Sequence, residues 1–463
     1  MILVFTHKVS NSLHYVLKEI FVNQWNLNFE ITQDKNHYLQ ASANIKIHYT
    51  EENIFDFEGH WIPNSNFLFT PDFSQINTQN DMPIGIISYP KNEIIDNAYQ
   101  KICEILTIEN DLKMGSEEFS FRKVYFPMPS TIGFDVFAHA FALMANVEEV
   151  LMQYTGGQKD KHGRFDTKQL KFVQQNMHLL PMADIAINRL QEYLNIKVER
   201  NNTFQIVPTA DIDQCFQFQG KSIVKFIGGG FKHPSTLKDR IKYVFNKQDK
   251  FAPSKTLSTI LGNHANSKIF WLCNAKETNK NKQISRENSN LHHEINESKT
   301  YANLGIHPSY QNELCYEIYK EELNWLENIA QLKIENSRQH YLHFKLPQTY
   351  TDLESLGIKH DWSMGFSQTI GFRNGSTIPR KWFNILDNSE HSLTIHSFSL
   401  MDVTCKNYLK LNSLHTNILS NSIKQIVKSI NGNFCFVIHN ESLSETDGWE
   451  GWRETFNTWA SNI

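Results

Sequence analysis

Two aspartates near the middle of this 463-residue chain have a spacing that could do chemistry. Asp211 and Asp213 are two residues apart at the end of a strand-like run, so both carboxylates point the same way if the strand continues through them. Two carboxylates so close are unfavourable unless a cation or a proton lies between them. The pair is therefore a candidate general base plus metal ligand. The alternatives are an acidic strand end open to water, or an Asx turn that starts a helix.

A cation and an imidazole alternate in the aromatic-rich stretch of residues 336–379. If the run is extended, Arg338, His340 and Leu342 share one face, because side chains alternate in a strand. A guanidinium beside an imidazole at a strand end suits a site that handles oxyanions or a metal. A half-buried edge strand with solvated polar positions remains the plain alternative, and this stretch alone does not decide between the two.

Titratable residues recur where strand-like runs end. In a parallel α/β barrel the carboxyl ends of the strands converge on one face, where active sites are built. The sequence therefore predicts one site that collects these residues, which are Asp211, Asp213, His307, Arg338, His340, Asp361 and His439.

Strands and helices alternate about six or seven times after residue 200, which predicts an α/β fold. The expected strands of this half are 204–207, 268–273, 302–306, 338–342, a run near 358, 392–397 and 433–438, and the expected helices include 291–297, 316–329, 350–356 and 408–430. Residues 228–230 are glycines that match no phosphate-loop pattern, so we interpret them as a flexible break.

The first 200 residues predict a smaller mixed α/β region without a catalytic constellation. Its expected strands are 1–6, 29–32, 45–49 and 84–88, and its expected helices are 10–21, 92–106, 134–151 (capped by Asp135) and 182–194. His139 is interpreted as a hydrogen-bonded core residue, and residues 156–166 as a solvated connection. We expect domains at 1–200, with a further division into 1–130 and 131–200 as an option, and at 201–463.

Composition narrows the classes of function. Hydrophobic residues make up 40% and charged residues 20%, as in soluble globular proteins, and a net charge of -4 gives no basic field for nucleic acid. The six cysteines are scattered without a CxxC pair, as expected of reduced thiols. The chain shows no signal-peptide pattern and no apolar run of about 18 residues, so no membrane span and a cytoplasmic location are expected.

Motifs over residues 203–463 resemble the polysaccharide deacetylase superfamily, also called carbohydrate esterase family four. T-A-D-I-D resembles its first motif, T-F-D-D-G, which implies that Asp211 is the catalytic base and Asp213 a metal ligand, although the family's acids are adjacent. G-I-H-P-S-Y-Q resembles the second motif, H-[ST]-x-x-H, which supplies two metal-binding histidines. His307 matches the first histidine, but Gln311 stands where the second is expected.

The resemblance also implies roles for the later residues. His340 is the candidate for the missing ligand, close to Arg338, which resembles the arginine that orients the base. Asp361 resembles the fourth motif. His439, in F-V-I-H-N, resembles the fifth, where the histidine is the general acid, and Asp361 is expected to orient it.

Other segments resemble a divergent bacterial branch of that superfamily. The patterns R-x-H-Y-L, D-x-S-x-G and G-F-R-x-G occur here, and the last contains Arg373, a second candidate to orient Asp211. In the N-terminal half, an F-D-x-F-A helix and the D-K-H-G-R-F-D loop resemble an uncharacterised domain that precedes such deacetylase-like domains.

The resemblance implies a distorted (β/α) barrel and a metal-dependent hydrolase that removes acetyl groups from a carbohydrate or glycan precursor. The implied cofactor is a divalent metal, Zn²⁺ first, with Co²⁺ or Mn²⁺ as alternatives. The altered second motif leaves open a catalytically silent barrel that binds glycan through aromatic side chains, and a metal-dependent hydrolase acting on another substrate. Docking of the N-terminal region to cell-envelope biosynthesis proteins is a further expectation.

Overall fold

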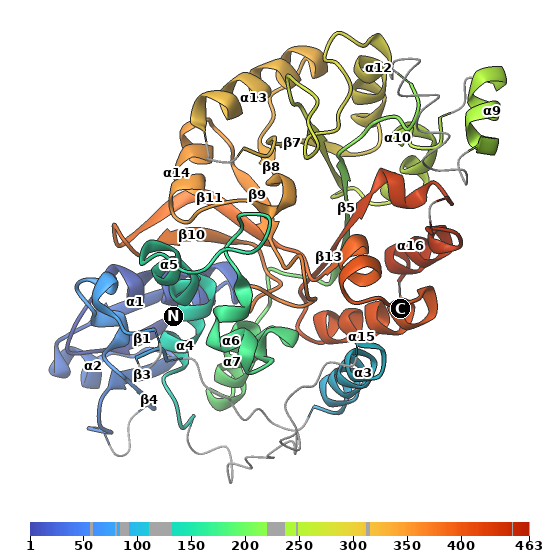
Figure 1. The fold of residues 1–463 in the computed structure, drawn as a ribbon. Helices are drawn as coiled ribbons and strands as arrows, with labels where there is room; N and C mark the ends of the chain where they lie inside the picture. Colours follow the sequence, from blue (N-terminus) through green and yellow to red (C-terminus); the bar gives the residue numbers. More distant parts are fainter. Residues whose placement is uncertain are drawn as a thin grey trace.

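A computed structural model describes most of the chain and shows two separate sheets joined by helices (Figure 1). The described residues are 1–55, 59–78, 81–83, 92–110, 132–219, 237–246, 249–311, 315–446, 448–462. The expected strand at 84–88 and the glycines at 228–230 lie outside them.

The N-terminal region contains a small parallel sheet of four strands in the order β2-β1-β3-β4. Its strands are β1 (Ile2–Phe5), β2 (Phe29–Thr32), β3 (Ile45–Thr50) and β4 (His60–Pro63). Its helices are α1 (Asn11–Leu17), continued by the π-helical η1 (Lys18–Gln24), then α2 (Lys35–Gln40), α3 (Glu93–Asn110), α4 (Val136–Met144), α5 (Val147–Tyr154), α6 (Lys171–Gln174) and α7 (Met182–Tyr193). The three described strands that the sequence predicted here are present.

The helix expected over 134–151 is two helices, α4 and α5. Asp135 caps the first as predicted, because its side chain accepts a hydrogen bond from the backbone N–H of Ala138. The chain then breaks at Asn146, whose φ of 51° is left-handed, a conformation that asparagine tolerates better than most residues. The hydrophobic period continues through the break, so the sequence pattern did not show it.

The second half contains a sheet of nine strands in the order β10-β11-β9-β8-β7-β6-β5-β13-β12. All neighbours are parallel except β10 and β11. The strands are β5 (Gln205–Ile212), β6 (Lys268–Leu272), β7 (Asn303–His307), β8 (Asn336–Ser337), β9 (His360–Met364), β10 (Arg380–Asn384), β11 (Ser389–Ser397), β12 (Leu400–Met401) and β13 (Asn433–His439).

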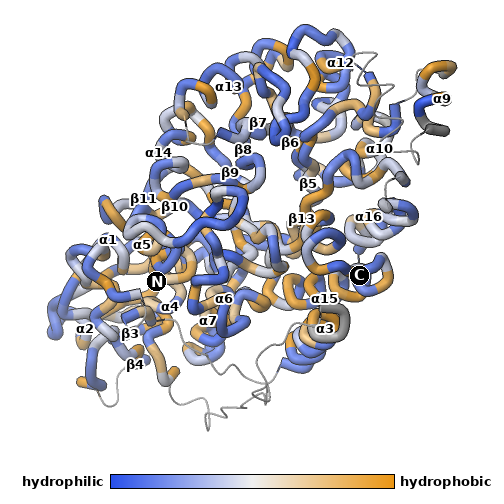
Figure 2. Tube along the Cα trace, in the orientation of Figure 1, coloured by the Kyte–Doolittle hydropathy of each residue, from blue (hydrophilic) through white to orange (hydrophobic). Residues whose placement is uncertain are grey.

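Helices surround the nine-stranded sheet on its outside, and the sheet curls between them (Figure 1). They are α9 (Leu237–Asn246), α10 (Pro253–Thr256), α11 (Ser258–Leu261), α12 (Ser289–Ser298), α13 (Tyr316–Ala330), α14 (Gln348–Ser355), α15 (Ser413–Ser429) and α16 (Trp452–Ala460). The neighbouring strands β5 and β13 are mostly apolar and buried along nearly their whole length, as expected of parallel strands covered on both faces (Figure 2). The protein is thus a mixed α/β protein with one curled large sheet and one small parallel sheet.

The strand expected through residues 338–342 is wrong. β8 has only two residues, and the chain turns at His340–Leu342, where Tyr341 and Leu342 have φ values of 59° and 53°. The alternation of polar and apolar residues that suggested a strand therefore belongs to a tight turn at the end of β8. The helix expected at 408–430 begins later, as α15, after a separate π-helical turn η8 (Thr404–Tyr408).

Several contacts join the N-terminal region to the large sheet. Helix α3 packs against α15 (Figure 1). The buried guanidinium of Arg380 on β10 lies 2.7 Å from Asp184 of α7. The division at residue 200 stays a prediction, and these contacts bury charged groups between the two regions.

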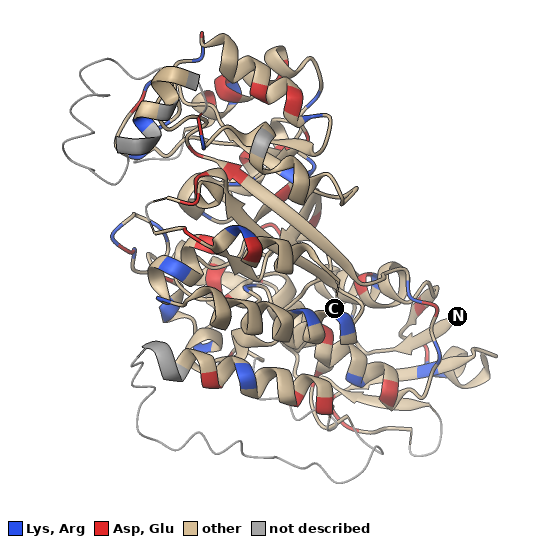
Figure 3. Cartoon of the chain, turned by 90° about the vertical axis from the view of Figure 1, so that its right-hand side faces the viewer, with Lys and Arg blue, Asp and Glu red and all other residues tan. Residues whose placement is uncertain are grey.

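The surface carries both signs of charge. Acidic and basic residues are interspersed along the helices (Figure 3), in keeping with the net charge of -4. Within the described part of the chain, none of the helices combines the length and the apolar character needed to cross a membrane.

Candidate metal centre

The predicted residues meet at the carboxyl ends of neighbouring strands. Asp211 on β5 lies opposite His439, the last residue of β13, and His307 ends β7. Asp213 follows β5 directly and Arg338 follows β8. Because these strands are parallel, their carboxyl ends lie at one edge of the sheet, and this edge brings the side chains together.

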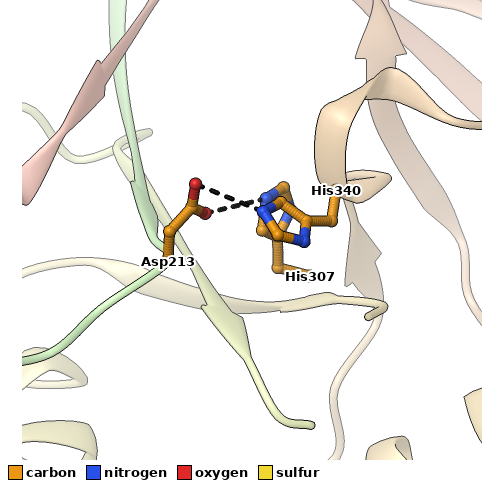
Figure 4. Close-up of side chains that lie close together, drawn as sticks. All are labelled: Asp213, His307 and His340. Atoms are coloured by element: carbon orange, nitrogen blue, oxygen red, sulfur yellow. Dashed lines mark ion pairs between the residues drawn. The ribbon is translucent and has the colours of Figure 1, made fainter. Parts of the chain in front are cut away.

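Asp213, His307 and His340 point toward one another and form a compact cluster (Figure 4). Nε2 of His307 lies 3.3 Å from Oδ1 of Asp213, and Nε2 of His340 lies 3.2 Å from Oδ2. One ligand atom from each residue lies within 4.8 Å of the others. The turn after β8 therefore supplies the third side chain, although it is not the extended strand that we expected.

Hydrogen bonds on the far side of each ring fix the orientation of both imidazole side chains. Nδ1 of His307 lies 2.6 Å from the carbonyl oxygen of Arg338, which can only accept, so Nδ1 carries the proton. Nδ1 of His340 lies 3.2 Å from Oδ1 of Asn281. This amide atom must be the oxygen rather than the nitrogen, because the backbone N–H of Tyr310 donates a hydrogen bond of 2.8 Å to it. Nδ1 of each ring is therefore held by an acceptor, and Nε2 of each ring faces Asp213.

This arrangement fits a divalent metal ion. Two ring nitrogens face one carboxylate, and the buried Oδ1 of Asp213 has no hydrogen-bond partner among the described residues. Burial alone would raise the pKa of Asp213, but the neighbouring His340 and His307 lower the pKa well below its ordinary value, so the group is a carboxylate. Two histidines and one carboxylate, with the outer nitrogens held by acceptors, are a ligand set that zinc takes in catalytic sites with an open position.

Asp211 lies beside this cluster and is paired with Arg338. Nη1 of Arg338 is 2.8 Å from Oδ1 of Asp211, and the other carboxylate oxygen is 3.9 Å from Nε2 of His307. The guanidinium is almost fully buried, lies over the ring of Phe270 at 4.4 Å, and donates through Nε to the carbonyl of Trp362. Arg338 is therefore fixed in position and holds the side chain of Asp211 next to the candidate ligands.

His439 faces the cluster from β13 and is held by Asp402. Nδ1 of His439 lies 2.8 Å from Oδ1 of Asp402, whose other oxygen accepts from the backbone N–H of His439 at 2.7 Å. Nε2 lies 3.9 Å from Asp213. Burial would lower the pKa of His439, but the carboxylate of Asp402 outweighs it and raises the pKa well above its ordinary value. The ring can therefore carry a proton.

The expectation that Asp361 orients His439 is wrong, because Asp402 does so. Asp361 is buried and accepts hydrogen bonds from Ser337 and Ser363, whose hydroxyl in turn accepts from the backbone N–H of Gln339. It therefore holds the chain that carries Arg338. Burial raises the pKa of Asp361 despite these hydrogen bonds.

Arg373 and Gln311 do not join the cluster. Arg373 forms a two-pronged ion pair with Glu149 of α5, so Arg338 alone orients Asp211. Gln311, where a second histidine was expected, donates to the hydroxyl of Ser309.

Sequence reasoning missed Asp402 and Asn281. Asp402 directly follows β12, which has only two residues, so no periodic pattern marked a strand end there. Asn281 lies in a polar connection among several asparagines and lysines, and nothing in the local sequence distinguishes it.

Comparisons with known proteins give a family-model match over the N-terminal region and remote similarities to solved structures. Residues 2–199 match a family of unknown function, DUF7033. No curated protein is similar enough to count as a match.

Three solved structures align with a little over half of the chain. One is a candidate polysaccharide deacetylase from Mycobacterium smegmatis, with 13% identity, a TM-score of 0.38, and coverage of 57% of this chain and 87% of that one. Another is a 4-alpha-glucanotransferase from Thermococcus litoralis, with 11% identity, a TM-score of 0.33, and coverage of 56% of this chain and 36% of that one. The third is the polysaccharide deacetylase Bc1974 from Bacillus cereus, with 7% identity, a TM-score of 0.25, and coverage of 56% of this chain and 86% of that one. The side-chain geometry, rather than these remote alignments, has to carry a functional conclusion.

Proposed function

We propose that this protein is a metal-dependent hydrolase that removes acetyl groups from a carbohydrate or glycan precursor. The observation that carries the proposal is the three-residue ligand set with two further titratable side chains within 4 Å of it. The carboxylate of Asp211 lies on one flank, and the imidazole of His439 on the other. The sequence motifs described above support the choice of an acetylated carbohydrate, and by that resemblance the curled nine-stranded sheet is a distorted barrel.

The ligand set suits a divalent cation such as Zn²⁺, with Co²⁺ or Mn²⁺ as alternatives. Asp213, His307 and His340 would hold it. When bound, such an ion supplies Lewis-acid catalysis and lowers the pKa of water. The hydrogen bonds from Nδ1 of each histidine to Arg338 and Asn281 keep Nε2 free for it.

The two flanking residues then act as general base and general acid. Asp211 accepts a proton from the attacking water, and the buried guanidinium of Arg338 orients its side chain for that task. His439, protonated at Nδ1 toward Asp402, donates the proton on Nε2 to the departing amine or alcohol. A base and an acid on either side of one centre are what the hydrolysis of an amide or ester needs.

Metal content and acetate release test the proposal together. We expect purified protein to bind one equivalent of zinc, and to release acetate from a β-1,4-linked tetramer of N-acetylglucosamine. Asp213→Ala and His307→Ala should fold and lose the metal. Asp387→Ala, an acidic residue on the surface of the β10–β11 turn, is the control and should keep it.

Three outcomes separate the alternatives. Full metal content in both ligand variants would overturn the assignment of the site. Folded wild-type protein that takes up no Zn²⁺, Co²⁺ or Mn²⁺ would favour a silent glycan-binding protein. Metal-dependent hydrolysis of other esters or amides without acetate release would point to a different substrate.

A further inference from the structure

The loop of residues 156–166 in the N-terminal region lies against the candidate site, although we expected a solvated connection. Arg164 is 6% exposed and forms an ion pair of 2.6 Å with Asp160, both side chains being almost fully buried. Its Nη1 also donates to the backbone carbonyl of Tyr341 at 3.2 Å. The charges of this loop are therefore used to attach it to the turn that follows β8.

A second attachment involves Tyr310, which lies after β7. Its hydroxyl donates to the backbone carbonyl of His162 at 3.0 Å. Gly163, with a φ of +77°, follows directly, and a Cβ there would lie 3.2 Å from that hydroxyl and 3.4 Å from Nε2 of His343. The loop can approach the large sheet this closely because it has glycine at this position.

Both attachment points contact the groups that hold the metal ligand His340. The ring centroid of Tyr341 lies 4.5 Å from that of His340. On the loop, the ring of His162 stacks on Tyr341, with the two centroids 5.5 Å apart and an angle of 29° between the ring planes. Tyr310 makes two backbone hydrogen bonds with Asn281, the residue that accepts from Nδ1 of His340. The loop therefore reaches a candidate ligand by two separate routes, one through Tyr341 and the other through Tyr310 and Asn281.

Tyr341 is held in a conformation that a tyrosine rarely adopts. Its φ of 59° and the 53° of Leu342 are left-handed, and such residues cost about 1–3 kcal/mol each unless their surroundings hold them. The hydrogen bond from Arg164 and the stacking of His162 act on this residue. Strain of this kind concentrates at ligand-binding sites, and here it places an aromatic ring at the edge of the metal centre.

Resting on the proposed function, we propose that the 156–166 loop is a specificity element of the metal site. The N-terminal region supplies one side of the substrate site, and Arg164 and His162 are positioning residues that act through Tyr341 and Tyr310. Aromatic rings and nearby polar groups suit a sugar ring, which has apolar C–H faces and hydroxyl edges. The occupant is the sugar unit next to the acetylated one, so longer oligosaccharides gain contacts that a single sugar lacks.

Equilibrium binding of two probes tests this inference. The probes are N-acetylglucosamine and its β-1,4-linked tetramer, titrated calorimetrically into full-length, zinc-loaded protein in which Asp211→Asn removes the proposed base, so that the tetramer is not consumed during the titration. Tyr310→Phe removes only the hydroxyl that reaches His162 and keeps the backbone contacts with Asn281. Arg164→Ala removes the other attachment, the hydrogen bond to the backbone carbonyl of Tyr341. Lys161→Ala is the matched control, because it removes an exposed positive charge from the same loop.

We expect Tyr310→Phe and Arg164→Ala to weaken tetramer binding about tenfold, as the loss of a hydrogen bond and of loop order would, and to leave monomer binding unchanged. Zinc content should stay at the wild-type value in both, and Lys161→Ala should resemble the wild type throughout. A merely structural role of the loop would instead lower the melting temperature or zinc content and weaken both probes equally.

Three results would overturn the inference: wild-type affinity for the tetramer in both variants, equal weakening for the two probes, or no tetramer binding by the wild-type protein. Failure of the proposed function is recognised separately. Wild-type protein without zinc or acetate release refutes the hydrolase, while a selective loss of tetramer binding in Tyr310→Phe still supports the role of the loop.

Discussion

Arg338 and His307 are joined through the backbone of the arginine, whose carbonyl oxygen accepts a hydrogen bond of 2.6 Å from Nδ1 of the histidine. The side chain of the same arginine donates to Asp211 at 2.8 Å. One residue therefore fixes both the candidate base and the tautomer of a candidate ligand. Because the contact with His307 uses the backbone and the contact with Asp211 uses the side chain, substitution can separate the two effects.

Arg338→Lys should lower kcat without loss of metal. Lysine keeps the charge, but as a point charge it cannot donate both to Asp211 and to the carbonyl of Trp362, so the base loses its orientation. We expect kcat to fall by about 10²-fold, within the range that general-base catalysis contributes. Zinc content should not change, because the carbonyl that holds His307 remains. Loss of zinc in parallel with activity would contradict this separation of roles.

Asp402→Asn should affect poor leaving groups more than good ones. Without the carboxylate, buried His439 no longer favours its protonated form, so the proton for the departing group is missing. We expect the rate on an acetamido sugar to fall by about 10²-fold or more, and the rate on 4-nitrophenyl acetate by less than about tenfold, since that leaving group needs no proton.

Asp361→Asn is the matched control for that experiment. Asp361 holds Ser337 and Ser363 and does not contact His439 through any hydrogen bond in the described structure, so the ratio of the two rates should stay at its wild-type value. A change in this ratio equal to that of Asp402→Asn would restore Asp361 as the residue that orients the general acid.

The placement of site residues was predictable where strands are long enough to be recognised. Asp211 and His439 follow apolar runs in β5 and β13, and parallel strands bring the carboxyl ends to one edge whatever the loops do. His307 was found by the same reasoning. For these residues the hydrophobic pattern along each strand was sufficient to place them near one another.

The partners of these residues were not predictable in the same way. Asp402 follows a strand of two residues, and Arg338 and His340 lie in a turn with left-handed residues that resembles an alternating strand in sequence. Arg373 looked equivalent to Arg338 because both are arginines in short, aromatic-rich runs. Only the position of Glu149, which is 224 residues distant in sequence, decides that Arg373 forms a structural ion pair.

Arg373→Ala should therefore unfold the protein more easily rather than act on catalysis. The variant leaves the carboxylate of Glu149, which is 1% exposed, buried without its partner, and breaking such a pair costs about 3–5 kcal/mol. The control is Lys18→Ala, which breaks a partly exposed ion pair with Glu390 between the same two regions and should cost less than about 1 kcal/mol. Chemical denaturation measures both. Wild-type stability with reduced kcat in Arg373→Ala would show a role at the site instead.

The N-terminal region should lose stability in mild acid because it buries a neutral histidine. His139 on α4 is fully buried, and this burial lowers its pKa to about 4, with one hydrogen bond to the carbonyl of Pro83 opposing the shift. Since the folded pKa lies below the ordinary value, the unfolded chain binds more protons between about pH 6.5 and 4. Stability is therefore complete above about pH 6.5 and falls as the pH is lowered to about 4, by about 3 kcal/mol in all for this residue.

Urea unfolding at pH 7.5 and pH 5, followed by fluorescence, measures how steeply the free energy of unfolding depends on pH. His139→Gln should be less stable at pH 7.5, where its packing is imperfect, but should lose less stability on going to pH 5 than the wild-type protein does. Equal losses in the two proteins would mean that other groups, such as the buried His178, dominate the acid response.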